Sequence, residues 1–328
     1  MTVAAADLPG WYLPVDGYLW DPWFHRSGDV VHLFHLFQAA PPGRTRASVF
    51  ARDRPVIAHA TWTRAEGWQS RGTALDYTGA PYDEDRIHTG CVTNHDGTFA
   101  MLYSGSNQFL CLAHSGDLDH WVKDPDNPVL SPDPARYRKR WRDPWLLQGL
   151  TGERHTVVIA AQYATHTGPP IGTVAVAHSP DLHHWRQDTP LLIPAWFTWL
   201  EVPELHHLDG LSYLVFATRE QWITPAGRDA LRAHGLPARD GAYYLMSATW
   251  RGPYESIGSL SEGPESGYTT RLLETAASEQ WLWSHVEYDR TGTPVFGLQA
   301  PRSCTVATSQ GQVPSAAHAV TAGQVGHR

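Results

Sequence analysis

Three acidic residues stand in short motifs that do not recur along the chain. They are Asp21 in Leu19-Trp20-Asp21-Pro22-Trp23, Asp143 in Trp141-Arg142-Asp143-Pro144-Trp145, and Glu201 in Trp199-Leu200-Glu201-Val202-Pro203-Glu204-Leu205. Taken singly, an acidic residue just before proline is typical of a turn. Three carboxylates brought together repel one another, so their convergence would need a purpose. Glycoside hydrolysis supplies one, because it uses one carboxylate as nucleophile or base and one protonated carboxyl as general acid.

A repeated motif indicates the elements that would position these acids. The segments 113–121 (AHSGDLDHW) and 177–185 (AHSPDLHHW) nearly superimpose, and each follows an alternating apolar run. Weaker copies lead to Trp68 and Tyr254. The pattern predicts a strand, a turn capped by Asp and a second strand, with the Trp filling the space between repeats. We interpret the repeat as a determinant of fold rather than of catalysis.

The segments between the repeats predict an all-β protein. Further strand-like runs cover 30–37, 99–104, 156–161, 213–217 and 281–288. With 28 Gly, 25 Pro and 15 Trp, the composition suits a turn-rich β structure. We expect a single five-bladed β-propeller over residues 15–305, preceded by an N-terminal segment (1–14) and followed by a flexible tail (306–328). An insertion at about 219–240 carries the one predicted helix, 225–234.

This architecture predicts where the acids meet. The innermost strand of each propeller blade lines the central channel, and the three motifs lie near the start of separate repeat units. Asp21, Asp143 and Glu201 should therefore face one central pocket. We expect Trp20, Trp23 and at least one of Trp141, Trp145 and Trp199 to line it as well.

Charge and cysteine content exclude several classes of protein. The formal net charge of −8 gives no overall attraction for nucleic acid or an anionic membrane surface, so neither partner is expected. No basic segment with a long apolar run opens the chain, which predicts a cytoplasmic protein. Cys91, Cys111 and Cys304 are odd in number and far apart, so we expect free or core thiols rather than disulfides.

No cofactor or metal site is predicted. Adjacent residues of a strand point to opposite faces, so neither His183-His184 nor His206-His207 can readily chelate one ion. The chain also lacks a phosphate loop, a dinucleotide fingerprint and a nucleophile elbow.

The order Trp-Asp-Pro, Arg-Asp-Pro, Glu-x-Pro-Glu-Leu resembles glycoside hydrolase family 32 and the wider clan with families 68, 43 and 62. The resemblance spans roughly residues 15–305. Supporting matches are 31–38 (VHLFHLFQ), similar to the family's Tyr-His-Leu-Phe-Tyr-Gln strand, and His59-Ala60-Thr61, similar to its His-Ala-Thr/Ser segment. His88-Thr89-Gly90-Cys91 stands where the family usually has Phe-Ser-Gly-Ser.

The resemblance implies a role for each acid. Asp21 would be the nucleophile, Asp143 the transition-state stabiliser beside Arg142, and Glu201 the general acid/base. Substrate contacts would come from Arg142, Trp20, Trp23, Gln38, His59, His88, Thr89, Glu204 and Trp199. We expect the like charges and apolar neighbours of Glu201 to raise its pKa, while Arg142 keeps Asp21 ionised.

Departures from the family pattern bear on the substrate. The family places Asn on both sides of the nucleophile motif, where this chain has Trp20 and Trp23; an indole can stack on a sugar but cannot replace an amide's paired donor and acceptor. Glu204 stands where the family commonly has Asp. Because the sequence ends at Arg328, it resembles a propeller without the family's C-terminal β-sandwich.

The resemblance implies a glycoside hydrolase or transglycosylase acting on a small-molecule or oligosaccharide furanoside, similar to a β-fructofuranosidase. One alternative is an inverting arabinofuranosidase or xylosidase like those of family 43, although the Arg142-Asp143 pair favours the fructosidase branch. Another is a redirected propeller that binds or transforms a natural product without glycoside hydrolysis.

Overall fold

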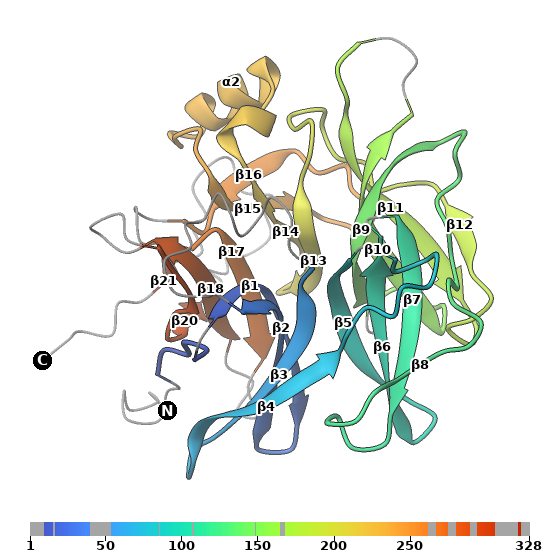
Figure 1. Cartoon of the computed structure of the whole chain (residues 1–328). Coiled ribbons are helices and arrows are strands. Elements are labelled where there is room, and N and C mark those ends of the chain that lie inside the picture. The colour runs from blue at the N-terminus through green and yellow to red at the C-terminus, as the bar shows by residue number, and fades with distance from the viewer. Residues whose placement is uncertain are drawn as a thin grey trace, which may run out of the picture.

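The computed structural model describes residues 10–15, 17–39, 54–84, 86–106, 108–147, 149–164, 168–261, 267–274, 280–288, 294–305 and 321–322. In this part of the chain, five antiparallel sheets surround a central axis (Figure 1). The prediction of an all-β, five-bladed propeller is confirmed.

The first three blades each follow the chain from one edge of the sheet to the other. Blade 1 consists of β1 (Gly17–Ser27), β2 (Val30–Ala39), β3 (Val56–Thr63) and β4 (Gly67–Leu75). Blade 2 consists of β5 (Ile87–His95), β6 (Thr98–Gly105), β7 (Phe109–Ser115) and β8 (Val122–Lys123). Blade 3 consists of β9 (Tyr137–Leu147), β10 (His155–Tyr163), β11 (Gly172–Ser179) and β12 (Arg186–Asp188).

The last two blades carry the irregular features. Blade 4 consists of β13 (Glu201–Leu208), β14 (Leu211–Thr218), β15 (Gly241–Ser247) and β16 (Ser256–Ser259). Blade 5 consists of β17 (Thr269–Glu274), β18 (Gln280–Tyr288), β19 (Pro294–Leu298), β20 (Arg302–Thr305) and β21 (Thr321–Ala322). Both β19 and β20 pair with β18, so two short strands fill the place of one. The pairing of β21 with β20 brings part of the expected tail into blade 5; the rest of that tail lies outside the described residues.

Apolar runs explain why the second strands form the middle of the blades. The five strand-like runs of the sequence correspond to β2, β6, β10, β14 and β18, the second strand of every blade. A central strand is covered on both faces, which selects near-continuous apolar sequence. In β10, eight of the nine residues are buried.

The Ser-x-Asp-Leu-x-x-Trp repeat forms the same turn in blades 2 and 3. Asp117 Oδ1 accepts hydrogen bonds from the backbone N–H groups of Asp119 (2.9 Å) and His120 (2.8 Å). Trp121 then donates from Nε1 to the carbonyl of Leu118 at 2.9 Å and lies edge-on to Phe34 of blade 1. The expected roles of the Asp as turn cap and the Trp as filler between blades are confirmed.

An insertion follows β14, as predicted. It comprises the 3-10 turn η2 (Glu220–Trp222) and helix α2 (Pro225–Ala233), which lies at the top of blade 4 in Figure 1. Thr224 caps the helix by accepting a hydrogen bond from the Gly227 N–H at 3.1 Å. Among the described residues, neither helical segment has the length and apolar character needed to cross a membrane.

The propeller ring closes through the N-terminal segment. Tyr12, which precedes blade 1, exchanges two backbone hydrogen bonds with Leu298 of β19 in blade 5, at 3.0 and 2.9 Å. Its ring packs against Trp68 and His35 of blade 1, with centroids 5.2 and 5.8 Å apart. Tyr12 therefore joins the first blade to the last.

Candidate functional site

Backbone bulges near the pocket ends of the inner strands turn the acidic motifs toward the axis. The pairing register shifts between Trp20 and Trp23 in β1, between Arg142 and Pro144 in β9, and between Glu201 and Glu204 in β13. Within these bulges Asp21 (φ 45°), Asp143 (φ 62°) and Val202 (φ 49°) adopt left-handed backbone conformations. Such conformations are costly for non-glycine residues and cluster at functional sites.

The bulge in β13 shows what the unusual conformation achieves. The Val202 N–H donates to Asp143 Oδ2 at 3.2 Å, while its carbonyl accepts a hydrogen bond from Arg271 at 3.0 Å. An unbroken β-ladder would bind both groups within the sheet. The bulge thus aims backbone groups at side chains of blades 3 and 5.

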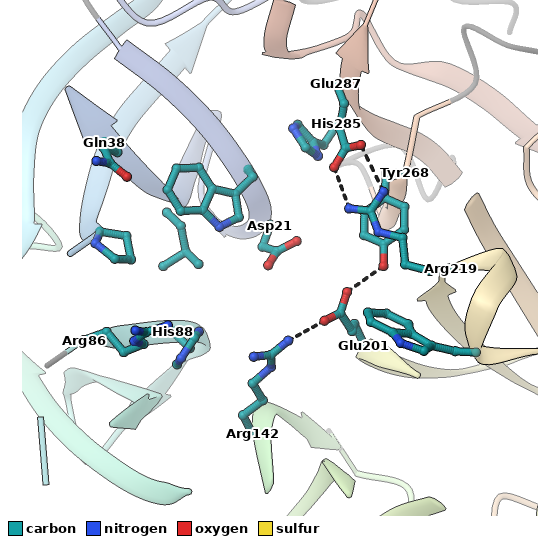
Figure 2. Close-up of a pocket in the computed structure, with 14 residues that line it drawn as sticks. Asp21, Gln38, Arg86, His88, Arg142, Glu201, Arg219, Tyr268, His285 and Glu287 are labelled. Carbon is teal, nitrogen blue, oxygen red and sulfur yellow. Dashed lines mark hydrogen bonds and ion pairs between the residues drawn. The ribbon is translucent and has the colours of Figure 1, made fainter. Parts of the chain in front are cut away.

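A cavity of about 220 Å³ opens where the inner strands meet. Figure 2 shows Asp21 and Glu201 pointing toward each other, with Arg86, His88 and Gln38 on one side and Arg219, Tyr268 and Glu287 on the other. The wall is completed by Trp20, Leu36, Pro55, Arg142, Trp222 and His285. All five blades contribute to it.

Glu201 is held by donors from three directions. Its Oε1 lies against the Arg142 guanidinium and accepts a hydrogen bond from Trp199 Nε1 at 3.1 Å. Its Oε2 accepts a hydrogen bond from the Tyr268 hydroxyl at 2.6 Å. Arg219 in turn stacks on the Tyr268 ring, 3.5 Å from the centroid. Glu201 is therefore fixed in one orientation.

Asp143 is only 3% exposed and is not among the residues that line the cavity, although we expected it to face the pocket. Thr89 donates to its Oδ1, and Arg142 Nε approaches Oδ2 at 3.4 Å. The Asp143 N–H donates to Ser104 of β6 at 2.9 Å. Blades 2, 3 and 4 thus orient this carboxylate jointly.

Asp21 has fewer donors, and its pKa reflects this. Thr269 donates to Oδ1 at 3.2 Å. Burial, reinforced by the negative charges of Glu201 and Asp143, raises the pKa of Asp21 to about 7, although Arg142 opposes the shift. Asp21 thus holds a proton more tightly than an ordinary aspartate.

The titration order of the two acids is the reverse of our expectation. Burial favours the neutral form of Glu201, but Arg142, Tyr268 and Trp199 outweigh it and bring its pKa below the usual range. We expected Arg142 to keep Asp21 ionised, whereas its close contact is with Glu201. In the free site the pKa of Asp21 is thus raised and that of Glu201 is lowered.

The tryptophans divide between the cavity and the core. Trp20 lines the cavity, but Trp23 is fully buried and stacks on Phe34, so the expectation that it reads the substrate is wrong. None of Trp141, Trp145 and Trp199 lies among the residues that line the cavity, although Trp199 bonds to Glu201 from the core. The bulge between Trp20 and Trp23 sends their side chains to different environments.

Two other expected substrate contacts serve the framework instead. His59 is 1% exposed, stacks on Phe34 and lies 3.1 Å from Asp119. Glu204 is also 1% exposed and forms a buried ion pair with Arg271, with 3.0 Å between the charged atoms. Neither side chain is among the residues that line the cavity.

The remaining expected contacts lie at or beside the cavity. Gln38, His88 and Arg142 line it, whereas Thr89 is buried and acts on Asp143. Burial, together with the neighbouring Arg142, lowers the pKa of His88 well below its usual range, so its imidazole is neutral. A neutral imidazole can donate one hydrogen bond to a sugar hydroxyl and accept another.

Sequence reasoning missed the wall contributed by the insertion and blade 5. Arg219, Trp222, Tyr268, His285 and Glu287 all line the cavity. Arg219 and Trp222 lie at the start of the insertion, and the insertion itself could be recognised in the sequence. Tyr268 stands in a segment without a motif, and only the contact with Glu201 reveals its place.

Comparisons with known proteins agree with this geometry. The model of the glycosyl hydrolases family 32 N-terminal domain matches residues 34–245. A sucrose-6-phosphate hydrolase from Pediococcus pentosaceus is 28% identical over 167 residues, which cover 48% of this chain and 32% of that protein. An acid beta-fructofuranosidase from Vicia faba is 42% identical over a shorter match that covers 20% of this chain and 12% of that protein. The matches thus span about a third or less of these relatives.

Solved structures share the fold at low sequence identity. A sucrose-6-phosphate hydrolase from Lactobacillus gasseri superimposes with a TM-score of 0.71 at 17% identity, covering 92% of this chain and 62% of that one. An inulosucrase from Halalkalicoccus jeotgali, bound to kestose, gives a TM-score of 0.67 at 19% identity and covers 94% and 91%. The family model matches well over half of this chain, and the protein therefore belongs to glycosyl hydrolases family 32.

Proposed function

We propose that the protein cleaves or transfers a furanosyl group, with Asp21 and Glu201 as the reacting carboxyl groups. The observation that carries this proposal is the placement of the two acids, which face each other across one cavity and are supported by Asp143. Membership of family 32 favours this reaction over that of a family 43-like enzyme.

In the proposed reaction, Asp21 attacks the anomeric carbon and forms a glycosyl ester, while Glu201 gives its proton to the departing oxygen. Water or another sugar hydroxyl then attacks the ester, and Glu201 takes the proton back. Asp21 must be ionised and Glu201 protonated when the first step begins. The raised pKa of Asp21 and the lowered pKa of Glu201 favour the opposite placement in the free site, so a proton has to pass from Asp21 to Glu201 before attack.

The cavity suits a neutral sugar ring. Trp20 offers an apolar face, and the neutral His88 and Gln38 offer donors and acceptors for hydroxyl groups. The relatives named for sucrose-6-phosphate, for fructofuranosides and for a kestose complex support a fructofuranoside as the substrate. We therefore propose small β-fructofuranosides as the substrate class.

Product analysis tests the proposal. The intact protein is incubated with sucrose, kestose and a panel of aryl furanosides, and released and transferred sugars are separated by chromatography. Asp21→Asn should abolish product formation. Asp29→Asn, which changes an exposed aspartate in the turn after the same strand, should keep it. Absence of product with the intact protein across the panel would instead favour a redirected propeller.

A further inference from the structure

Three potential metal ligands meet where blade 2 packs against blade 3, outside the central cavity. His114 lies in β7, Asp124 follows β8, and His183 belongs to the turn after β11. Asp124 Oδ2 is 2.8 Å from His114 Nε2 and 2.9 Å from His183 Nε2, and the three ligand atoms lie within 4.8 Å of one another. We propose that these residues form a zinc site that links the two blades.

The hydrogen bonds of His183 require either a proton or a metal ion between its Nε2 and Asp124. Its Nδ1 lies 3.1 Å from the carbonyl oxygen of Asp181, and a carbonyl can only accept, so Nδ1 carries the proton. In the neutral ring, Nε2 then directs a lone pair at the Asp124 carboxylate. His183 Nε2 and the Asp124 carboxylate, both acceptors and 2.9 Å apart, need a proton or a metal ion between them. A hydrogen bond from the other ring nitrogen to a backbone carbonyl, as His183 Nδ1 makes, is typical of histidines that bind a metal.

The repeat itself shows how this interface differs from its neighbour. The residue before the Ser of the repeat is His114 in blade 2 and His178 in blade 3, and the Asp at the end of the last strand is Asp124, which directly follows β8, and Asp188, the last residue of β12. Asp188 contacts His178 at 3.0 Å and is bound from blade 4 by Arg251 at 2.5 Å. His183 takes the place of Arg251 at the interface of blades 2 and 3. The guanidinium of an arginine supplies a fixed positive charge, whereas a neutral imidazole can supply a nitrogen lone pair to a metal ion.

Ligand chemistry and access favour zinc. Two imidazole nitrogens and one carboxylate oxygen form a ligand set that zinc accepts in tetrahedral sites, with water in the fourth position. The side chains of His114 and His183 are 36% and 34% exposed, so an ion can enter from solvent. In a tetrahedral zinc site the ligand atoms lie about 3.3 Å apart, so the distances from Asp124 to His114 and to His183 need to lengthen by about half an ångström.

The sequence could not predict this cluster. Adjacent histidines do not share a ligand position, and in the structure His184 turns away to Asp181 while His183 faces Asp124. The three ligands come from two blades and lie up to 69 residues apart. Only the packing of one blade on the next assembles them.

Calorimetric titration with zinc chloride, after dialysis of the full chain against a chelator, tests the proposal. We expect one Zn²⁺ per chain and a higher melting temperature with zinc. His183→Arg recreates the Asp188–Arg251 arrangement, so it should keep the fold but weaken zinc binding at least about 10-fold. His184→Ala, which removes the exposed neighbour, should bind as the intact protein does.

The outcomes separate a metal ligand from a simple ion pair. Equal zinc affinity in His183→Arg and the intact protein would overturn the proposal, as would the absence of stoichiometric binding. In the second case, an imidazolium on His183 would fulfil the role of Arg251. Circular dichroism checks that each variant is folded. Furanoside cleavage is not part of this readout, so the result is independent of the proposed function.

Discussion

Asp21 and Glu201 differ in the number of hydrogen-bond donors that surround them. Arg142, Tyr268 and Trp199 all bind Glu201, whereas Asp21 receives a hydrogen bond from Thr269. The two acids titrate as a pair, so the state with one proton defines the active form whichever carboxyl holds it. That state persists between the lower pKa of the pair and the value of about 7 for Asp21.

This proton count predicts the pH dependence of activity. As the pH rises through about 7, the pair loses its last proton and no acid remains for the leaving group, so kcat/KM should fall. At low pH both carboxyls become protonated and the nucleophile is lost. Initial rates from pH 3 to 9 should give a bell-shaped profile. A rate that stays constant to pH 9 would show that neither carboxyl supplies the acid.

The role of Glu201 predicts a dependence on the leaving group. In Glu201→Gln, substrates with alkoxide leaving groups such as sucrose should lose about 10²–10⁴-fold in rate, because they need protonation. Activated aryl furanosides should lose much less, whereas Asp21→Asn should be poor on both. Rates on both substrate types decide the matter. Equal and small losses in Glu201→Gln would remove Glu201 from the acid role.

At the scale of elements, the buried pair of Glu204 and Arg271 fastens β13 to β17. Glu204 also accepts hydrogen bonds from the Leu272 N–H at 3.1 Å and from His206 at 3.0 Å. Arg271 reaches the carbonyls of Pro22 and Val202, the residues that follow Asp21 and Glu201. This pair therefore holds the backbone next to both reacting acids in place.

Loss of one partner should destabilise the fold. Glu204→Gln would leave the Arg271 charge buried without its counter-ion, so we expect the free energy of unfolding to fall by about 3 kcal/mol. Glu274→Gln changes an exposed acid at the end of the same β17 and should change it little. Urea unfolding of both variants measures the difference. An unchanged midpoint for Glu204→Gln would mean that the ion pair contributes no net stability.

The positions of the strands could be predicted from the sequence, but the positions of the bulges within them could not. Near-continuous apolar runs located the second strand of every blade, since burial on both faces leaves a clear pattern. The bulges at Asp21, Asp143 and Val202 depend on contacts with other blades, such as that of Val202 with Asp143. For this reason Trp23 and Glu204 were assigned to the cavity although the bulged strands turn them into the core.

At the scale of the whole molecule, a repeat and three single-copy motifs were enough to predict the propeller and the entry of Asp21 and Glu201 into one cavity, but not the burial of Asp143 outside its lining. The cavity residues of blade 5 could not be predicted, because Tyr268, His285 and Glu287 reach the cavity only when the ring of blades closes. The same holds for the cluster of His114, Asp124 and His183. These particular contacts between blades have no local signature in the sequence.

Ring closure makes Tyr12 a testable point of stability. Its backbone pairs with blade 5 while its ring packs on blade 1, and the side chain is 8% exposed. Tyr12→Ala should lower the free energy of unfolding by about 3 kcal/mol, a cost typical of removing a buried aromatic ring. Trp11→Ala removes a neighbouring ring that is 47% exposed and should cost far less. Similar losses in both variants would argue against a special role for Tyr12.

The bond between Tyr12 and Leu298 also sets the order of events during synthesis. Leu298, the partner of Tyr12, is made 286 residues after it. Blades 1 to 4 can pair their own strands as they emerge, since each is built from consecutive segments. The seam between blades 1 and 5 can form only after blade 5 has been made. Until then the nascent protein exposes an open edge, and an intact central cavity exists only after translation has passed blade 5.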